Sequence, residues 1–354
     1  MRITVIGAGN GGSAVAADLA LKGHDVILLK TSKSLHSKHF EEVLNNGYKI
    51  ELVRGKKSST AQLKLATYDY GEALKDSEVV ILFIQTNYHE QVIKKMSKFM
   101  KDQIVLVEPG YLATLYFMKY CNCDELTIAE AESSPIDCRI VEPGKVISRF
   151  ENETNPIGIY TKCNEDKAFE KLQKLGYNFV KANSVAESAL HNPNLIVHTV
   201  GAFMSIPRIE YTDGNYWMYK EVFTPTVWNI VEGLDKEKMD VMEKLGYKRI
   251  PYVEACKHRN STEDGRDATE VFFDYAQNYS TPGPHVSDSR YLTEDVPEGL
   301  VLLESIGKHL GVDTTVCTSL INLSSTALGI DFREEGRTLE KLGIENFKKI
   351  INRE

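Results

Sequence analysis

Three ionisable side chains in the second half of the chain have the types that a proton-transfer site needs. His198 ends the segment HNPNLIVH, whose other residues are mainly apolar at helical spacing, and Arg290 and Asp295 stand five residues apart ahead of an apolar run. An imidazole exchanges protons near neutral pH, a carboxylate can orient it, and a guanidinium can bind a carboxylate through two hydrogen bonds. Structural roles fit these residue types as well: a histidine packed in a core, and an aspartate capping the helix that begins near Thr293.

A glycine-rich sequence near the start of the chain lies where a dinucleotide-binding turn would be. Residues 7–12 read GAGNGG, between the apolar run RITVI and an Ala- and Leu-rich helical pattern over 12–22. Gly7 would permit the tight turn, Gly9 the approach of backbone to a pyrophosphate, and Gly12 close packing of helix on strand. The positive end of the helix would face the phosphates. The residues expected to bind a dinucleotide here are Gly7, Gly9, Asn10, Gly11 and Gly12.

The residues after the second predicted strand bear on which dinucleotide is used. NAD-binding units usually carry an acid there, which binds the ribose 2′-hydroxyl. This chain has Lys30, Thr31, Ser32 and Lys33 instead. Two ammonium groups and two hydroxyls suit a 2′-phosphate better than a diol, although lysines at such a place can also be solvated surface residues. The sequence therefore favours NADP(H), with NAD(H) as the other candidate.

The elements that must position these residues change in kind along the chain. We predict strands over 2–7, 24–29, 78–84, 103–107, 126–129, 156–160 and 177–180, separated by amphipathic segments such as 90–101 and 165–175. Strands alternating with helices predict a parallel sheet covered on both faces. Helical patterns then follow over 185–204, 225–245 and 299–308, with loops around a short helix over 257–288. The fold class is thus α/β: a Rossmann-type doubly wound domain over 1–182, then an all-helical substrate domain over 183–354.

Composition and charge exclude several other classes of protein. The chain is 42% apolar and 26% charged, with a formal charge of -8 and no basic run interleaved with aromatics, so we expect no nucleic-acid partner. Neither a signal peptide nor 18 consecutive apolar residues is present, so we expect no membrane span. Six scattered cysteines offer no metal-ligand set and predict reduced thiols in a cytoplasmic protein. Helical second domains often associate, which keeps a homodimer among the expectations.

Four segments together resemble the opine dehydrogenases, the octopine/nopaline and N-(carboxyethyl)amino-acid dehydrogenase family: GAGNGG, NPNLIVH, RYLTEDVPEGLV and DFREEGRTLEKLGI. The resemblance spans nearly the whole chain. It implies an enzyme that condenses the amine of an amino acid with a 2-oxo acid and reduces the imine with NAD(P)H. It also implies His198 as the catalytic histidine, Asp295 as its partner, and Arg290 as the group that holds the 2-oxo acid. A working pair should lie within about 2.6–3.2 Å, and we expect the site in the cleft between domains.

Two other functions remain open on the sequence. The first is a reductase of 2-oxo or hydroxy compounds, similar to ketopantoate reductase or glycerol-3-phosphate dehydrogenase. Such enzymes typically use a lysine on a helix of the second domain, whereas residues 182–201 contain no lysine and do contain His198. The second is a catalytically silent NADP-binding sensor, against which the complete set of His198, Arg290 and Asp295 argues.

Overall fold

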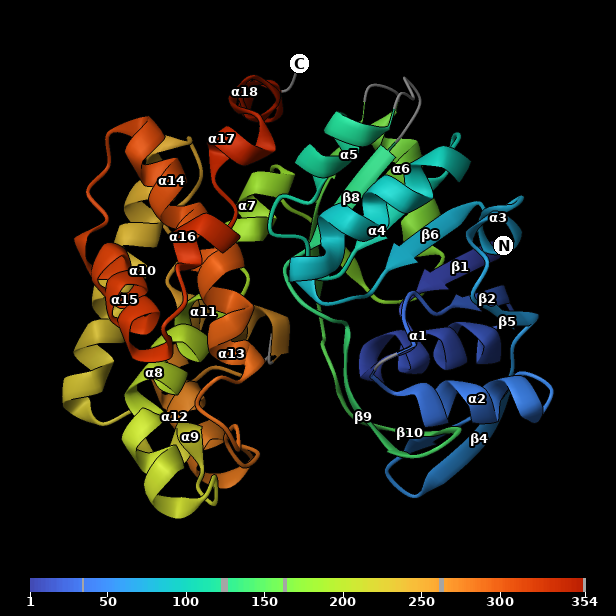
Figure 1. The fold of residues 1–354 in the computed structure, drawn as a ribbon, viewed down its shortest axis with the longest axis horizontal. Coiled ribbons are helices and arrows are strands. Elements are labelled where there is room, and N and C mark those ends of the chain that lie inside the picture. Colours follow the sequence, from blue (N-terminus) through green and yellow to red (C-terminus); the bar gives the residue numbers. More distant parts are fainter. Residues whose placement is uncertain (34, 122–126, 162–163, 261–263, 353–354) are drawn as a thin grey trace. The chain divides into compact units, whose positions relative to one another are not determined.

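The computed structural model describes residues 1–33, 35–121, 127–161, 164–260 and 264–352. The chain divides into two compact units, residues 1–188 and 189–352, each drawn in Figure 1. This division falls inside helix α7 (Val185–Leu190), later than the predicted boundary after residue 182. The start of α7 packs on the sheet of the first unit: a Cβ on Gly158 would lie only 2.1 Å from the Ser184 carbonyl oxygen.

An eight-stranded sheet with the order β12-β11-β8-β7-β6-β1-β2-β5 forms the centre of the first unit. Its neighbouring strands pair in parallel except for β8 and β11, which are antiparallel. The order reverses between β1 and β6, and open α/β sheets bind ligands outside the carboxyl ends of strands at such a point. The strands are β1 (Arg2–Ile6), β2 (Asp25–Leu29), β5 (Leu65–Thr67), β6 (Val79–Leu82), β7 (Ile104–Val107), β8 (Thr127–Ala131), β11 (Asn155–Tyr160) and β12 (Phe179–Lys181).

A mainly parallel sheet is therefore confirmed, with β8 and β11 as its antiparallel pair, and the burial of its strands gives the physical reason. The four residues of β6 and of β7 are all buried, as expected for strands covered on both faces. Strand β5 was not predicted, and Leu126 of the predicted strand over 126–129 lies outside the described residues. The accompanying helices are α1 (Asn10–Leu21), α2 (Ser37–Asn45), α3 (Tyr70–Leu74), α4 (His89–Met96), α5 (Thr114–Tyr120) and α6 (Glu165–Gln173).

A second, four-stranded sheet with the order β4-β3-β10-β9 was missed by the sequence analysis. Its strands are β3 (Lys49–Arg54), β4 (Lys57–Gln62), β9 (Ile136–Glu142) and β10 (Lys145–Glu151). Most of their side chains are polar and at least partly exposed, so they lack the apolar runs that identify the larger sheet. Helix α1 packs against strands of both sheets. Arg54 of β3 pairs with the buried Asp18 of α1, which joins this small sheet to the helix.

The regular elements among the described residues of the second unit are all helices, as predicted. Helix α8 packs against α9, α10, α13, α15 and the π-helix η3, so it forms the centre of the unit. None of the helices in the described part of the chain has the length and apolarity needed to span a membrane. The elements are α8 (Asn194–Thr212), α9 (Met218–Glu221), α10 (Pro225–Lys244), α11 (Tyr252–Asn260), α12 (Ala268–Asn278), α13 (Arg290–Thr293), η3 (Val296–Leu300), α14 (Val301–Leu310), α15 (Thr315–Leu328), α16 (Phe332–Glu335), α17 (Leu339–Leu342) and α18 (Ile344–Asn352).

Two helical predictions need correction. The single helix expected over 185–204 is two, α7 and α8, separated by residues 191–193. Pro193 has no backbone N–H and disfavours helical geometry at Asn192, so the first helix cannot continue through it. The segment over 257–288 is also more helical than predicted, because α11 and α12 occupy much of it.

Candidate active site

The glycine-rich turn lies between β1 and α1, at the carboxyl edge of the larger sheet where the strand order reverses (Figure 1). Gly7 has a φ of +114°, and a Cβ there would lie 2.1 Å from the Phe83 carbonyl oxygen, so the position requires glycine. A Cβ on Gly12 would lie 1.8 Å from the Gly7 carbonyl oxygen. At Gly9 the atom nearest to a Cβ would be His36 Cδ2, at 3.8 Å. The turn is closed where α1 packs and open at Gly9, which is the shape that a pyrophosphate needs.

The first residues of α1 contribute in different ways. A Cβ on Gly11 would overlap the Phe83 ring, so this glycine serves packing. The Asn10 side chain, which we expected at the cofactor, accepts a hydrogen bond at Oδ1 from the Ile140 N–H at 2.8 Å and thus ties α1 to β9. The first backbone N–H groups of a helix have no acceptor within it and form its positive end. The backbone of this turn, more than the Asn10 side chain, therefore fits the phosphates.

Lys30 follows β2 directly, and its side chain has a partner within the protein. Its side chain is buried, and Nζ donates a hydrogen bond to the Leu35 carbonyl oxygen at 2.5 Å. Burial lowers the pKa of this ammonium group. Lys30 is therefore not a solvated surface lysine. It closes the loop that follows β2.

The remaining residues of this loop are better placed to meet a cofactor. Thr31 is half-buried, whereas Ser32 and Lys33 are exposed. Lys33 Nζ lies 5.9 Å from the centroid of the Tyr68 ring, at the outer range of a cation–π contact. His36, which the sequence analysis passed over, has a positive φ of 56° and lies beside the open face of Gly9. Only the folded loop identifies it, because nothing in its sequence neighbourhood resembles a cofactor motif.

In the second unit, the structure brings His198 and Asp295 together. His198 Nδ1 lies 2.9 Å from Asp295 Oδ2, within the range predicted for a working pair. Asp295 makes no capping hydrogen bond to the helix that it precedes, so its reading as a helix cap is wrong. Its side chain is 4% exposed, against 14% for His198. A carboxylate oxygen accepts a hydrogen bond from Nδ1–H, so this contact favours the tautomer that carries its proton on Nδ1 and leaves Nε2 without one.

Local sequence explains how each partner is presented. Helix α8 starts after Pro193, and the Asn192 Oδ1 accepts a hydrogen bond from the Asn194 N–H at 3.0 Å. His198 lies one turn on, flanked by the buried residues Val197 and Thr199. Asp295 lies between α13 and η3, and single π-turns of this kind are frequent at functional sites. Both side chains therefore lie where α8 packs against α13.

Tyr291 is a site residue that the sequence analysis missed. Its ring stacks on the His198 imidazole with centroids 3.6 Å apart and planes 5° from parallel. A parallel aromatic face at this distance restrains the plane of the imidazole. The one signal in the sequence was its position between Arg290 and Asp295, in the segment RYLTED.

Arg290 neighbours this stack on α13. Its Nε lies 3.1 Å from Glu294 Oε2, one helical turn later, and its side chain is 56% exposed while that of Glu294 is 6% exposed. The buried carboxylate therefore orients an exposed guanidinium. A guanidinium held in this way is suited to a planar carboxylate ligand. The structure brings Asp295 and Tyr291 into contact with His198, and Arg290 directly precedes Tyr291 on α13.

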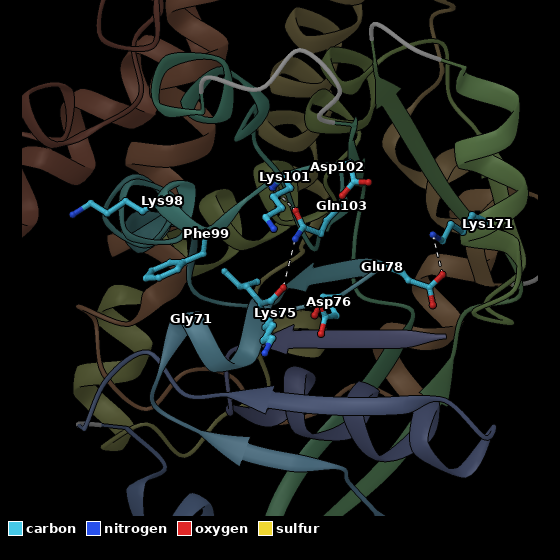
Figure 2. A pocket seen from close by; sticks show the side chains of 12 residues that line it. Gly71, Lys75, Asp76, Glu78, Lys98, Phe99, Lys101, Asp102, Gln103 and Lys171 are labelled. Carbon is cyan, nitrogen blue, oxygen red and sulfur yellow. Dashed lines mark hydrogen bonds and ion pairs between the residues drawn. The ribbon is translucent and has the colours of Figure 1, made fainter.

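A hollow of about 600 Å³ lies elsewhere, at the amino edge of the larger sheet (Figure 2). Several polar groups that line it bind one another. Lys171 pairs with Glu78 at 3.1 Å, and Gln103 accepts a hydrogen bond from the Lys101 N–H at 2.6 Å. The glycine-rich turn lies at the opposite, carboxyl edge. This hollow is therefore separate from the dinucleotide turn.

Two family models match separate parts of the chain. Residues 181–328 match the family described as NAD/NADP octopine/nopaline dehydrogenase, alpha-helical domain, and residues 2–110 match NAD-dependent glycerol-3-phosphate dehydrogenase N-terminus. An opine dehydrogenase of Arthrobacter sp. (strain 1C) is 28% identical over 347 residues, which cover 96% of this chain and 94% of that protein.

Solved structures give the same fold. Octopine dehydrogenase, determined with NADH and L-arginine, has a TM-score of 0.80 at 17% identity and covers 100% of this chain and 98% of its own. Yersinopine dehydrogenase with NADP+ has a TM-score of 0.75 at 14% identity, covering 98% and 93%. The dinucleotide turn and the matched helical unit together define an NAD(P)-dependent oxidoreductase. Over nearly its whole length the chain is similar to an opine dehydrogenase, and its helical unit matches the octopine/nopaline dehydrogenase family.

Proposed function

We propose that this chain catalyses the NAD(P)H-dependent condensation of an amino acid with a 2-oxo acid to an N-(carboxyalkyl)amino acid, and the reverse reaction. The observation that carries the proposal is the 2.9 Å contact between His198 and Asp295. The names of the relatives point to the same chemistry, since octopine dehydrogenase has been solved with L-arginine and with pyruvate. A small 2-oxo acid similar to pyruvate is therefore the first co-substrate to examine.

The proton transfers of this reaction suit the His198–Asp295 pair. Imine formation needs a neutral amine and then the loss of water from a carbinolamine, and one group must take and return the protons. In our proposal His198 Nε2 does so, while Asp295 holds Nδ1–H and stabilises the imidazolium. Tyr291 restrains the plane of the ring. The four groups therefore divide into proton carrier, orienting carboxylate, stacking partner and, in Arg290, a cation.

Arg290 is the residue we propose for the carboxylate of the 2-oxo acid. Its guanidinium is exposed and oriented by Glu294, and a planar fork binds a carboxylate through two hydrogen bonds. The nicotinamide, when bound, supplies the hydride that reduces the imine carbon. The open face at Gly9 and the first turn of α1 would hold its pyrophosphate. The exposed Ser32 and Lys33, with Thr31, favour a 2′-phosphate and hence NADP(H).

A second candidate function is suggested by the match of residues 2–110 to the glycerol-3-phosphate dehydrogenase N-terminus. A reductase of that kind would reduce a carbonyl compound directly, with no amine. The absence of lysine over 182–201 and the presence of His198 argue for the opine reaction. The two activities separate cleanly, because only one of them needs an amino acid in the assay.

The deciding experiment is a screen of twenty amino acids against pyruvate, glyoxylate and 2-oxoglutarate with both reduced cofactors. Oxidation of NADPH or NADH that requires an amino acid together with a 2-oxo acid, and a product with the mass of the reduced conjugate, supports the proposal. Oxidation by a carbonyl compound alone would assign the second candidate function instead. If no pair of substrates is turned over while NADPH still binds, the chain would be assigned as a catalytically silent NADP-binding sensor.

We further propose that the enzyme works in the cytoplasm as a homodimer. Large aromatic side chains stand exposed on the helical unit, with Tyr211 86% and Tyr279 72% exposed, and they could be covered by a second copy. Light scattering during size-exclusion chromatography tests this. A monomer mass at micromolar concentration would contradict the dimer.

A further inference from the structure

The C-terminal segment DFREEGRTLEKLG (331–343) has no part in the function proposed above, yet it docks onto the helical segment that follows Asp295. Its first contact is ionic: Arg333 Nε and Nη2 each lie 2.6 Å from a carboxylate oxygen of Glu304 on α14. Helix α16, which carries Arg333, also packs against η3. The segment is therefore built onto the polypeptide that presents Asp295.

Closer to the site, the backbone itself makes contact. A Cβ on Gly336 would lie 2.5 Å from the Pro297 carbonyl oxygen and 3.0 Å from Val301 Cβ, so only glycine permits this approach. The Arg337 N–H donates a hydrogen bond to the same Pro297 carbonyl oxygen at 3.0 Å. A carbonyl inside η3 is thus held from outside the helix, two residues after Asp295.

The Arg337 side chain then continues inward to a buried acid. It is 1% exposed and forms an ion pair through Nε with Glu298 Oε2, whose side chain is 7% exposed. Burial raises the pKa of Glu298, the Arg337 guanidinium opposes this rise, and the charges of Glu294 and Asp295 add to it. Removing one partner of a buried ion pair is costly, because the other charge is left uncompensated.

Residues 294–298 therefore place three carboxylates in little more than one turn of chain, and each has a basic partner. Glu294 pairs with Arg290, Asp295 with His198, and Glu298 with Arg337. The first of these cations is exposed and the last is buried. The buried pair is the one that can anchor the turn.

We propose that Arg337 is a positioning residue for the His198–Asp295 pair, and this inference rests on the function proposed above. Arg337 neutralises Glu298 and holds the Pro297 carbonyl, and so fixes η3 in the place where Asp295 reaches His198. Without Arg337, either residues 294–298 have to shift or Glu298 has to take up a proton.

The kinetic test compares Arg337→Met with Arg333→Met, a matched control that removes the other arginine–glutamate pair of the same segment. Both variants should unfold at lower temperature. Arg337→Met should lower kcat about tenfold at temperatures where the protein stays folded, with the KM for NADPH unchanged, whereas Arg333→Met should keep the wild-type kcat. Arg337→Lys should recover part of the loss. A kcat reduced equally by both changes would overturn the proposal and make the segment merely structural.

A double-variant cycle shows whether the effect passes through Asp295. In an Asp295→Asn background, Arg337→Met should cost little further kcat, because groups that act as one unit are non-additive. A full additional tenfold loss in that background would refute the assignment. Should Arg337→Met fail to fold, Arg337→Lys and Glu298→Gln carry the same cycle.

The final measurement needs no turnover and separates failure of this inference from failure of the proposed function. In nitrogen-15 NMR, the Nδ1–H of His198, assigned by its loss in His198→Ala, should be observed in wild type and in Arg333→Met. It should be lost or broadened in Asp295→Asn and in Arg337→Met. An unchanged signal in Arg337→Met contradicts positioning by Arg337, whatever substrate the enzyme uses. A wild type inactive in the substrate screen contradicts only the proposed function.

Discussion

The two units form their functional groups in opposite ways. In the first, the dinucleotide turn consists of six consecutive residues, 7–12, whose backbone geometry follows from glycine at each critical position. In the second, His198 and Asp295 are 97 residues apart, and their contact depends on the packing of α8 against α13 and η3. A change in the second unit should therefore affect the chemistry and spare cofactor binding. The predictions below test this separation.

The largest effect should come from His198→Ala. Removing the proton carrier should lower kcat by roughly two to four orders of magnitude, while the dissociation constant for NADPH stays within about twofold. Asp295→Asn should cost less and should add little in the His198→Ala background. Steady-state kinetics and a fluorescence titration with NADPH measure the two quantities. If His198→Ala weakened NADPH binding as strongly as it lowers kcat, the two units would not be functionally separable.

Next in size is the carboxylate contact of Arg290. Arg290→Lys keeps the charge and loses the planar fork, so the KM for the 2-oxo acid should rise roughly tenfold, which corresponds to about 1.4 kcal/mol. The KM for NADPH should not change. Glu294→Gln, which weakens only the group that orients the guanidinium, should give a smaller rise of the same kind. A higher KM for cofactor would assign Arg290 a structural role.

Tyr291 should show a moderate effect that depends on its ring and not on its hydroxyl. Tyr291→Phe keeps the stack on His198 and should retain most activity, whereas Tyr291→Leu should lower kcat several-fold. Loss of the stacked ring frees the plane of the imidazole, so the loss should appear in kcat while the KM for NADPH stays unchanged. An equal kcat for the Phe and Leu variants would count against the stacking role.

In the first unit, substitutions of the two lysines after β2, Lys30 and Lys33, should have different effects. Lys33→Glu should reduce the preference for NADPH over NADH by up to about tenfold, about 1.4 kcal/mol. Lys30→Met should mainly lower the melting temperature, because it removes the bond that closes the loop to Leu35. A wild type that already prefers NADH tenfold would show that the loop does not recognise a phosphate.

The smallest expected effect concerns pH and stability. Burial raises the pKa of Glu108 to about 8 from its usual 4.5, and burial lowers that of His191 in the second unit to about 3 from 6.5. Between pH 4.5 and 8 folded Glu108 keeps a proton that the unfolded chain releases, so its contribution to stability falls as pH rises. His191 acts oppositely: stability is lost as pH falls from 6.5 towards 3.

Glu108→Gln, a neutral side chain of the same shape, tests the first half of this contrast. At pH 8 the variant should melt roughly 5 °C above wild type, since 1 kcal/mol corresponds to about 2–4 °C in a domain of this size. At pH 5 the difference should be small. Calorimetry at the two pH values measures this, and an equal shift at both would mean that the effect is not one of titration.

The sequence predicted most of the larger sheet because its strands are apolar over their whole length, and this pattern is visible without any tertiary information. It did not predict the β4-β3-β10-β9 sheet, whose residues are polar and become a sheet by pairing with one another against α1. Lys30 illustrates the same limit. Its residue type suggested a phosphate contact, and only the folded loop places its ammonium at the Leu35 carbonyl.

What the sequence by itself determined is what neighbouring residues decide: the turn at Gly7, the alternation of strands and helices in the first unit, and the helical nature of the second. Backbone sterics and the spacing of apolar side chains act over a few residues, so they can be inferred directly from the order of the chain. The tertiary structure alone decided the His198–Asp295 hydrogen bond, the Tyr291 stack and the burial of Arg337 against Glu298. These join distant segments, and their geometry depends on helix packing, which no local pattern encodes.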